Sequence, residues 1–179
     1  MRLTPLRPDE IPRLRRACAA AAHTLKAAGE RVAPGVSTAD LDAFVRAHTA
    51  EQGGRPSQLG YRGDGPRPFP ASVCTSVNDV VCHGVPRSDV VLRDGDIVNI
   101  DVTTELDGFH GDCSATFFVG APSPLARHVV EAARRARDAG VAAVRPGGHL
   151  GDVGAAVLAV ANAARCTVVR EFGGHGIGR

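Results

Sequence analysis

The feature that most constrains the fold is a pair of β-prone runs on either side of Asp107-Gly108. Residues 97–102 are mostly apolar, and residues 116–119 are rich in β-formers. An Asp-Gly dipeptide between two such runs is a strong signal for a two-residue hairpin loop. With that loop, Leu106 pairs with Phe109, and this pair sets the register of the whole hairpin.

The register decides whether two carboxylates meet. It places Asp101 opposite Ser114, and Asp112 opposite Thr103. Because side chains alternate between the faces of a strand, Asp101 and Asp112 then share one face as diagonal neighbours, about 7–8 Å apart at Cα. A bulge at either neighbouring glycine would shift this pairing.

Two aspartates on one strand face repel each other unless a cation lies between them. The strand around Asp101 reads as apolar on both faces, which predicts burial. A buried pair of charges without a cation is very costly. We therefore favour a divalent-metal site, with a solvated outer face as the alternative interpretation.

Composition narrows the class of protein. A length of 179 residues fits a single domain, 1–179, and a formal net charge of +2 gives no electrostatic footprint for specific nucleic-acid binding. The five cysteines are odd in number and lack paired CxxC spacing, which predicts a reducing compartment without disulfides. No apolar run approaches the roughly 20 residues of a membrane span. The expected location is cytoplasmic, with no membrane contact.

The rest of the chain predicts helices and short strands around the hairpin. Helices are expected at residues 9–31, from 37 onward, at 123–144 and at 152–164. Further strands are expected at 72–77, 80–86 and 167–169. The strands at 72–77 and 80–86 would form a second hairpin about Asn78-Asp79. Asp9 is expected to cap the first helix, while Arg13, Arg15 and Arg16 form a solvated face. Residues 52–70, rich in glycine and proline, are expected to be a functional loop.

The helices recur as a repeat. Pro34-Gly35 is followed by Asp40, and Pro146-Gly147 is followed by Asp152 at the same spacing. In each copy a helix ends at Pro-Gly and the next helix begins a few residues later. The sequence therefore predicts an α+β fold with a pseudo-two-fold repeat of helix–helix–β-hairpin units.

A His-Gly pair marks each copy of the repeat. His83-Gly84 recurs as His175-Gly176, and glycines around His175 predict a close approach of the backbone to a site. A thiol protease built on Cys82 and His83 is disfavoured, because the sequence supplies no helix N-terminus or oxyanion loop that would activate the thiolate. The second copy has no carboxylate hairpin after its histidine. We therefore expect a domain that is incomplete at its C-terminal end, with strands of the sheet missing.

Four motifs together resemble the type I methionine aminopeptidases over essentially the whole chain. The motifs are SVNDVVCHGVP at residues 76–86, GDIVNIDV at 95–102, GFHGD at 108–112 and GHGIG at 174–178. Residues 78–86 separate this family from the proline-directed aminopeptidases that share its fold. The resemblance implies a pita-bread fold around a curved antiparallel sheet, and removal of the initiator methionine from nascent proteins.

The resemblance also implies a site. It assigns Asp101, Asp112 and His175 as ligands of two divalent metal ions (Co, Mn, Fe or Zn), which activate water for hydrolysis of the first peptide bond. His83 would be a catalytic residue that contacts the substrate. Tyr61, Phe69 and Cys74 would line the pocket for the methionine side chain. The family's two glutamate ligands and a second catalytic histidine are expected beyond residue 179.

The implied partners are the N-termini of nascent polypeptides, with a ribosome association as an option and the protein as a monomer. Because ligands are expected outside the sequence, we predict impaired activity for the 179-residue chain. The alternative function is a non-catalytic peptide-binding module of the same fold. The retained carboxylates favour the enzyme, since a binding module has no need of them.

Overall fold

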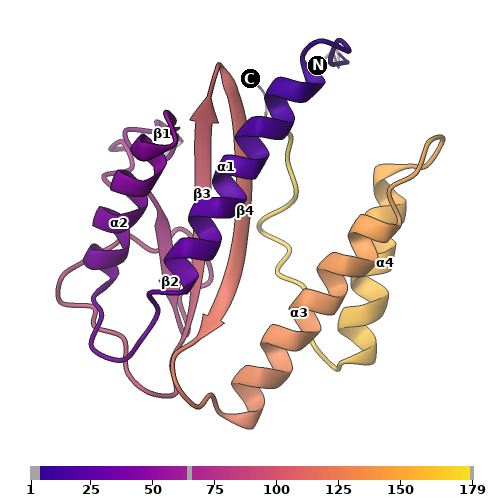
Figure 1. Cartoon of the computed structure of the whole chain (residues 1–179). Helices are drawn as coiled ribbons and strands as arrows, with labels where there is room; N and C mark the ends of the chain where they lie inside the picture. Colours follow the sequence, from indigo (N-terminus) through magenta and orange to yellow (C-terminus); the bar gives the residue numbers. More distant parts are fainter. Residues whose placement is uncertain (1–4, 64–65, 178–179) are drawn as a thin grey trace. The chain divides into compact units, whose positions relative to one another are not determined.

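The computed structural model describes residues 5–63 and 66–177, and the chain forms two compact units. The first unit comprises Met1–Ala121 with Gly176–Arg179, and the second comprises Pro122–His175. The first unit contains α1 (Ile11–Gly29), α2 (Thr38–Glu51), β1 (Arg55–Pro56), β2 (Cys74–Val77), β3 (Ile97–Leu106) and β4 (Phe109–Phe118) (Figure 1). The second unit contains α3 (Pro124–Ala142) and α4 (Leu150–Ala163).

The predicted hairpin and its register are confirmed. β3 and β4 pair antiparallel, with Leu106 opposite Phe109, Asp101 opposite Ser114, and Thr103 opposite Asp112. The turn residues Asp107 and Gly108 have φ values of 54° and 76°. Positive φ at both central residues is what a type I′ turn requires, and the twist of that turn matches the twist of the flanking strands.

β3 is apolar on one face only, so the prediction that it is apolar on both faces is wrong. Val98, Ile100 and Val102 are buried, while the alternate side chains, including Asp101, are half-buried. The physical reason is the strict alternation of a strand with one covered face. The covered face of the hairpin carries the core, and the other face carries the polar side chains.

Helix α1 covers the core face of the hairpin (Figure 1). Its buried stripe is made mostly of alanines, such as Ala17, Ala21 and Ala28, whereas the larger Ile11 and Cys18 are exposed. Small side chains allow a close approach. At Gly111 a Cβ atom would lie 2.2 Å from the carbonyl oxygen of Ala17.

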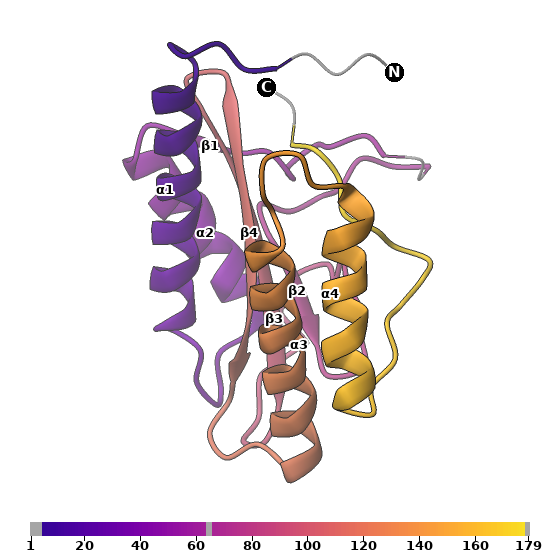
Figure 2. The ribbon, with the colours of Figure 1, turned by 90° about the vertical axis from the view of Figure 1, so that its right-hand side faces the viewer.

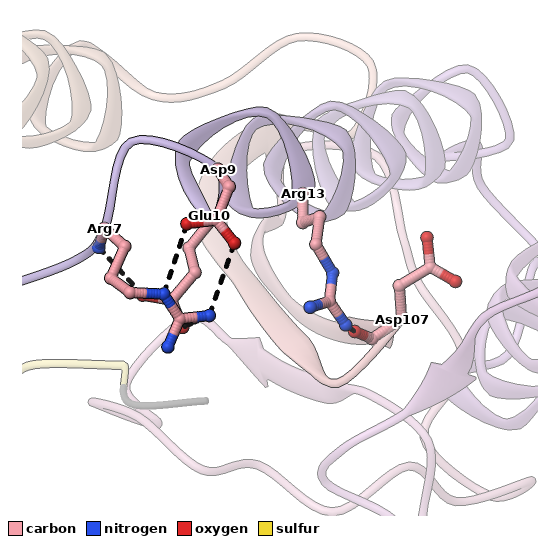
Figure 3. A network of polar contacts seen from close by, with 5 residues as sticks. All are labelled: Arg7, Asp9, Glu10, Arg13 and Asp107. Atoms are coloured by element: carbon pink, nitrogen blue, oxygen red, sulfur yellow. Dashed lines mark hydrogen bonds and ion pairs between the residues drawn. The ribbon is translucent and has the colours of Figure 1, made fainter.

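The start of α1 differs from the prediction. Asp9 does not cap the helix: the N-cap is Glu10, with no side-chain cap hydrogen bond. Figure 3 shows that Asp9 instead pairs with Arg7, whose guanidinium lies 3.2 Å from its carboxylate. The Glu10 carboxylate is buried and accepts a hydrogen bond from the Arg7 amide at 2.8 Å.

The arginine cluster of α1 is not simply a solvated face. Arg13 donates to the carbonyl oxygen of Asp107 at 2.5 Å (Figure 3). It also stacks over the Phe109 ring, 4.8 Å from its centroid. Arg16 pairs with the Asp107 carboxylate at 2.8 Å. Two of the three arginines therefore fasten α1 to the hairpin turn.

The predicted second hairpin is wrong. β2 pairs antiparallel with β3 instead, and residues 80–86 form no strand. The returning segment contacts β2 through the backbone bonds from Thr75 N to Gly84 O at 2.8 Å and from Val80 N to Val77 O at 3.1 Å. The long apolar run of β3 offers β2 a full ladder, which a segment ending in Pro86 does not.

Two smaller expectations also change. The 52–70 loop, whose residues 64 and 65 lie outside the described part, contains the two-residue strand β1, which pairs with β3. Residues 167–169 are not a strand, and Val168 and Val169 are exposed. A strand needs a partner for its ladder, and the described residues provide none at this position.

The repeat of helix pairs is confirmed. Ser37 caps α2 in a capping box with Asp40, and at the corresponding place in α4 the Asp152 carboxylate accepts a hydrogen bond from the His149 amide at 3.0 Å. The glycines before them, Gly35 and Gly147, both have positive φ. In the second unit α3 and α4 lie side by side (Figure 2), in contact where Gly140 faces Val157.

None of the helices in the described part of the chain combines the length and the apolar character that a membrane crossing requires.

Candidate functional site

The polar face of the hairpin carries the two predicted aspartates together. Asp101 on β3 is half-buried, and Asp112 on β4 is exposed. Thr103, directly opposite Asp112, donates its hydroxyl to Asp112 Oδ1 at 3.1 Å. The Asp112 carboxylate is therefore oriented by a neighbour on the adjacent strand.

Cys74 lies beside this carboxylate pair. It is paired with Asp101 across the β2–β3 ladder and is only 4% exposed. The pKa of its thiol is raised to about 12. Burial is the main cause, and the charges of Asp101, Cys82 and Asp112 contribute to the same rise. The β3–β4 register puts both carboxylates on one face of the sheet, and Cys74 lies opposite Asp101 on the neighbouring strand.

The donor chemistry of this face fits a hard divalent cation. Two carboxylates on adjacent, hydrogen-bonded strands are oxygen ligands held by rigid elements. In the described part of the chain, no three side chains of His, Cys, Asp or Glu gather as a metal-binding group. The hairpin therefore offers two carboxylates as candidate ligands, and a complete coordination shell would need further donors.

The loop before β2 is fastened to the strand that carries Asp101. The Gln58 side chain donates from Nε2 to the Asp101 carbonyl at 2.8 Å, and its Oε1 accepts from the Thr103 amide at 3.0 Å. The Ser57 amide donates to the Thr103 carbonyl at 2.8 Å. Three consecutive hydrogen bonds therefore join this loop to β3 beside the carboxylates.

The same face is ordered toward the hairpin turn. Ser57 Oγ lies 2.8 Å from His110 Nδ1, and Arg55 is hydrogen-bonded to Glu105. That Arg55 bond is the main cause that lowers the pKa of Glu105, and the Gly108 amide adds to it. These contacts give the polar face fixed side-chain positions on both sides of Asp112.

The backbones of Tyr61 and Phe69 are hydrogen-bonded to each other within the same loop. Phe69 N donates to Tyr61 O at 2.9 Å, and Gly60 N donates to Phe69 O at 2.8 Å. The Tyr61 side chain is 66% exposed, and Phe69 is half-buried. The structure therefore brings these two predicted pocket residues together, while Cys74 lies on the sheet.

His83 is exposed and lies in an irregular segment beside β2, not in a strand. Its φ is 55°, a left-handed conformation that is uncommon outside glycine and that often marks a functional site. Gly84 lies close against β2, since a Cβ there would lie 2.2 Å from Thr75 O. Gly84 thus holds the His83 backbone against β2, one residue from Cys74.

His175 belongs to the second unit and is exposed. A Cβ at Gly173, Gly174 or Gly176 would meet no described atom within 4 Å. The close approach of this segment to a site stays a prediction. Gly178 and Arg179, the end of this motif, lie outside them.

Two residues that order this polar face, Thr103 and Gln58, were not predicted from the sequence. Thr103 could have been found, because the hairpin register already places it opposite Asp112. Gln58 left no local signal, since it lies in an irregular loop and its partners are 43 and 45 residues away in the sequence.

Comparison with known proteins identifies the family to which the chain is similar. The model of metallopeptidase family M24 matches residues 12–179. Methionine aminopeptidases A and B of Synechocystis sp. are each 45% identical, over 99% and 95% of this chain and over 68% and 62% of their own lengths. The crystal structure of methionine aminopeptidase from Rickettsia prowazekii superposes with a TM-score of 0.93 at 38% identity, covering 99% of this chain and 69% of that one.

The chain thus spans about two thirds of the length of these relatives. The likeness of the fold to a solved methionine aminopeptidase confirms the predicted α+β pita-bread architecture, of which the chain covers a part. By its sequence and its fold, the chain belongs to metallopeptidase family M24.

Proposed function

We propose that residues 1–179 belong to one catalytic domain of a methionine aminopeptidase, which removes the N-terminal methionine from nascent proteins. The observation that carries this proposal is the pair of carboxylates, Asp101 and Asp112, on one face of a hairpin whose register is fixed. The proposed substrate, a peptide with an N-terminal methionine, is inferred from the names of the similar proteins. The partners are N-termini of nascent polypeptides, met at the ribosome in the cytoplasm by a monomeric protein.

The metal ligands in this proposal are Asp101, Asp112 and His175. They hold divalent cations, two in number, with Co, Mn, Fe and Zn as the candidate metals. Such ions supply a water activated near neutral pH and polarise the substrate carbonyl. The chain's own contribution is to hold the carboxylates in place, which Thr103 does for Asp112.

His83 is the proposed catalytic group that contacts the substrate. Its exposed imidazole and left-handed backbone, beside β2, leave the ring accessible to a peptide that lies over Cys74. Tyr61, Phe69 and Cys74 provide the apolar surface for the methionine side chain. A neutral imidazole can accept a hydrogen bond from the substrate or transfer a proton near its scissile amide.

Metal binding by the chain is the first test. Titration with Mn²⁺ should show binding that Asp112→Asn and Asp101→Asn each weaken at least tenfold. Asp89→Asn is the matched control, because Asp89 is exposed and paired with Arg87 away from the hairpin. Equal Mn²⁺ affinity of Asp112→Asn and the wild type would refute the assignment of the ligands.

Methionine release is the second test, with the protein from the complete reading frame and a Met-Ala-Ser peptide. We expect His83→Ala to lower kcat/KM about 100-fold while Mn²⁺ affinity stays within about twofold. Metal loss as large as that of Asp112→Asn would give His83 a different role. Peptide binding without any release of methionine would favour the non-catalytic module.

A further inference from the structure

Strand β3 has a gap in its ladder beside the carboxylates. On this edge, β2 pairs with β3 as far as Asp101, and β1 pairs with it from Thr104 onward. The Asp101 carbonyl and the Thr103 amide lie at this edge, where the pairing with β2 ends at Asp101 and the pairing with β1 begins at Thr104. The amide group of Gln58 bonds both, and so takes the place of a strand residue.

The gap lies next to the group that orients Asp112. The Thr103 amide donates a hydrogen bond to Gln58 Oε1, and the Thr103 hydroxyl donates one to the Asp112 carboxylate. Gln58 also bonds the peptide carbonyl of Asp101 itself. One side chain is thus connected to both carboxylates, in each case through a single residue of β3.

Gln58 also begins the turn that carries Tyr61. Its carbonyl accepts from the Tyr61 amide at 2.9 Å, and Gly60 within the turn has a φ of 79°. Glycine at that position with positive φ is typical of a type II turn. The side chain of Gln58 therefore bonds the metal-ligand strand, while its backbone closes the turn of the proposed pocket.

We infer that Gln58 is a positioning residue that couples the Tyr61 turn to the carboxylates Asp101 and Asp112. This inference rests on the proposed function, which makes the carboxylates metal ligands and the Tyr61 turn part of the methionine pocket. A primary amide carries a donor and an acceptor on one planar group, which is what the carbonyl and the amide of a strand edge require. A metal at the carboxylates and a methionine side chain at Tyr61 then stabilise the same arrangement of loop and strand.

The test uses Gln58→Met, which keeps the length of the side chain and removes both hydrogen bonds. Outer-shell partners of metal ligands typically change metal affinity 10- to 100-fold, so Mn²⁺ should bind at least tenfold more weakly to this variant. Hydrogen exchange at the Thr103 and Tyr61 amides should accelerate at least tenfold. Gln52→Met is the matched control, since Gln52 bonds Thr24 between α1 and α2, away from the carboxylates. It should leave Mn²⁺ affinity and both exchange rates unchanged.

The coupling also has a test that needs no variant. Because linkage between two sites is reciprocal, Mn²⁺ added to the wild-type chain should slow exchange at the Thr103 and Tyr61 amides. If Gln58→Met fails to fold, this measurement on the wild-type chain still tests the coupling between the carboxylates and the Tyr61 turn. Unchanged exchange at both amides on addition of Mn²⁺ would overturn the coupling.

The outcomes separate the two proposals. Wild-type Mn²⁺ affinity in Gln58→Met, together with weak binding by Asp112→Asn, would overturn the role of Gln58 and leave the metal site standing. Mn²⁺ binding that Asp112→Asn does not weaken would overturn the proposed function. Weakened binding and faster exchange in Gln58→Met, but not in Gln52→Met, would support the inference.

Discussion

Gly111 is the position where a single methyl group should most damage the hairpin. It lies on β4 next to Asp112, on the face that packs against α1. A Cβ placed there would lie 2.2 Å from the carbonyl oxygen of Ala17 and 2.6 Å from the Cα of Cys18. Both are backbone atoms, so no rotamer change can make room, and α1 must move away from the hairpin as a unit.

The size of that movement sets the magnitude. Ordinary contact for a Cβ begins near 3.4 Å, so the Ala17 carbonyl at 2.2 Å must withdraw by about 1 Å. A radial gap of about 0.5–1 Å forfeits a quarter to a half of the dispersion energy along the contact. That loss falls on the buried stripe of α1, which includes Ala21 and Leu25. We expect Gly111→Ala to lower the free energy of unfolding by about 3 kcal/mol, the upper part of the range for overpacked cores.

Urea unfolding followed by circular dichroism measures this loss. With a slope of about 2 kcal/mol/M, the midpoint should fall by about 1.5 M. Gly154→Ala is the matched control, because Gly154 lies inside α4 and an added Cβ meets nothing within 4 Å. That variant should gain about 0.5–1 kcal/mol from helix propensity. A Gly111→Ala chain as stable as the wild type would refute the backbone-contact argument.

Three further predictions concern stability. Arg13→Ala should cost about 1 kcal/mol in urea unfolding, through its lost bond to the hairpin turn and its stacking on Phe109, while Arg15→Ala should stay within about 0.5 kcal/mol. Ser37→Ala removes the N-cap of α2 and should cost about 1 kcal/mol in the same measurement, and an unchanged midpoint would contradict the cap. The pKa of Cys74 is raised to about 12 in the folded chain, so above about pH 9 the unfolded chain loses the thiol proton more readily than the folded chain does. The free energy of unfolding should therefore be unaffected by this thiol below about pH 9 and should fall as the pH rises toward 12. Thermal unfolding measures this fall, which should be smaller in Cys74→Ser.

The sequence by itself determined the local structures. Asp107-Gly108 specified the turn, and the turn specified the register that puts Asp101 and Asp112 on one face. Ser37 and Asp40 specified the start of α2 in the same way. Each of these features depends on the chemistry of residues a few positions apart, so the energies that favour it are present in the chain before it folds.

Only the tertiary structure decided which segments meet. β2 pairs with β3 and not with its neighbour in sequence, Arg13 reaches the hairpin turn, and Gln58 fills a gap in a distant ladder. Such contacts depend on where other elements end and on which backbone groups they leave unpaired. A buried or half-buried polar group must find a partner wherever the fold provides one, and no local pattern records that choice.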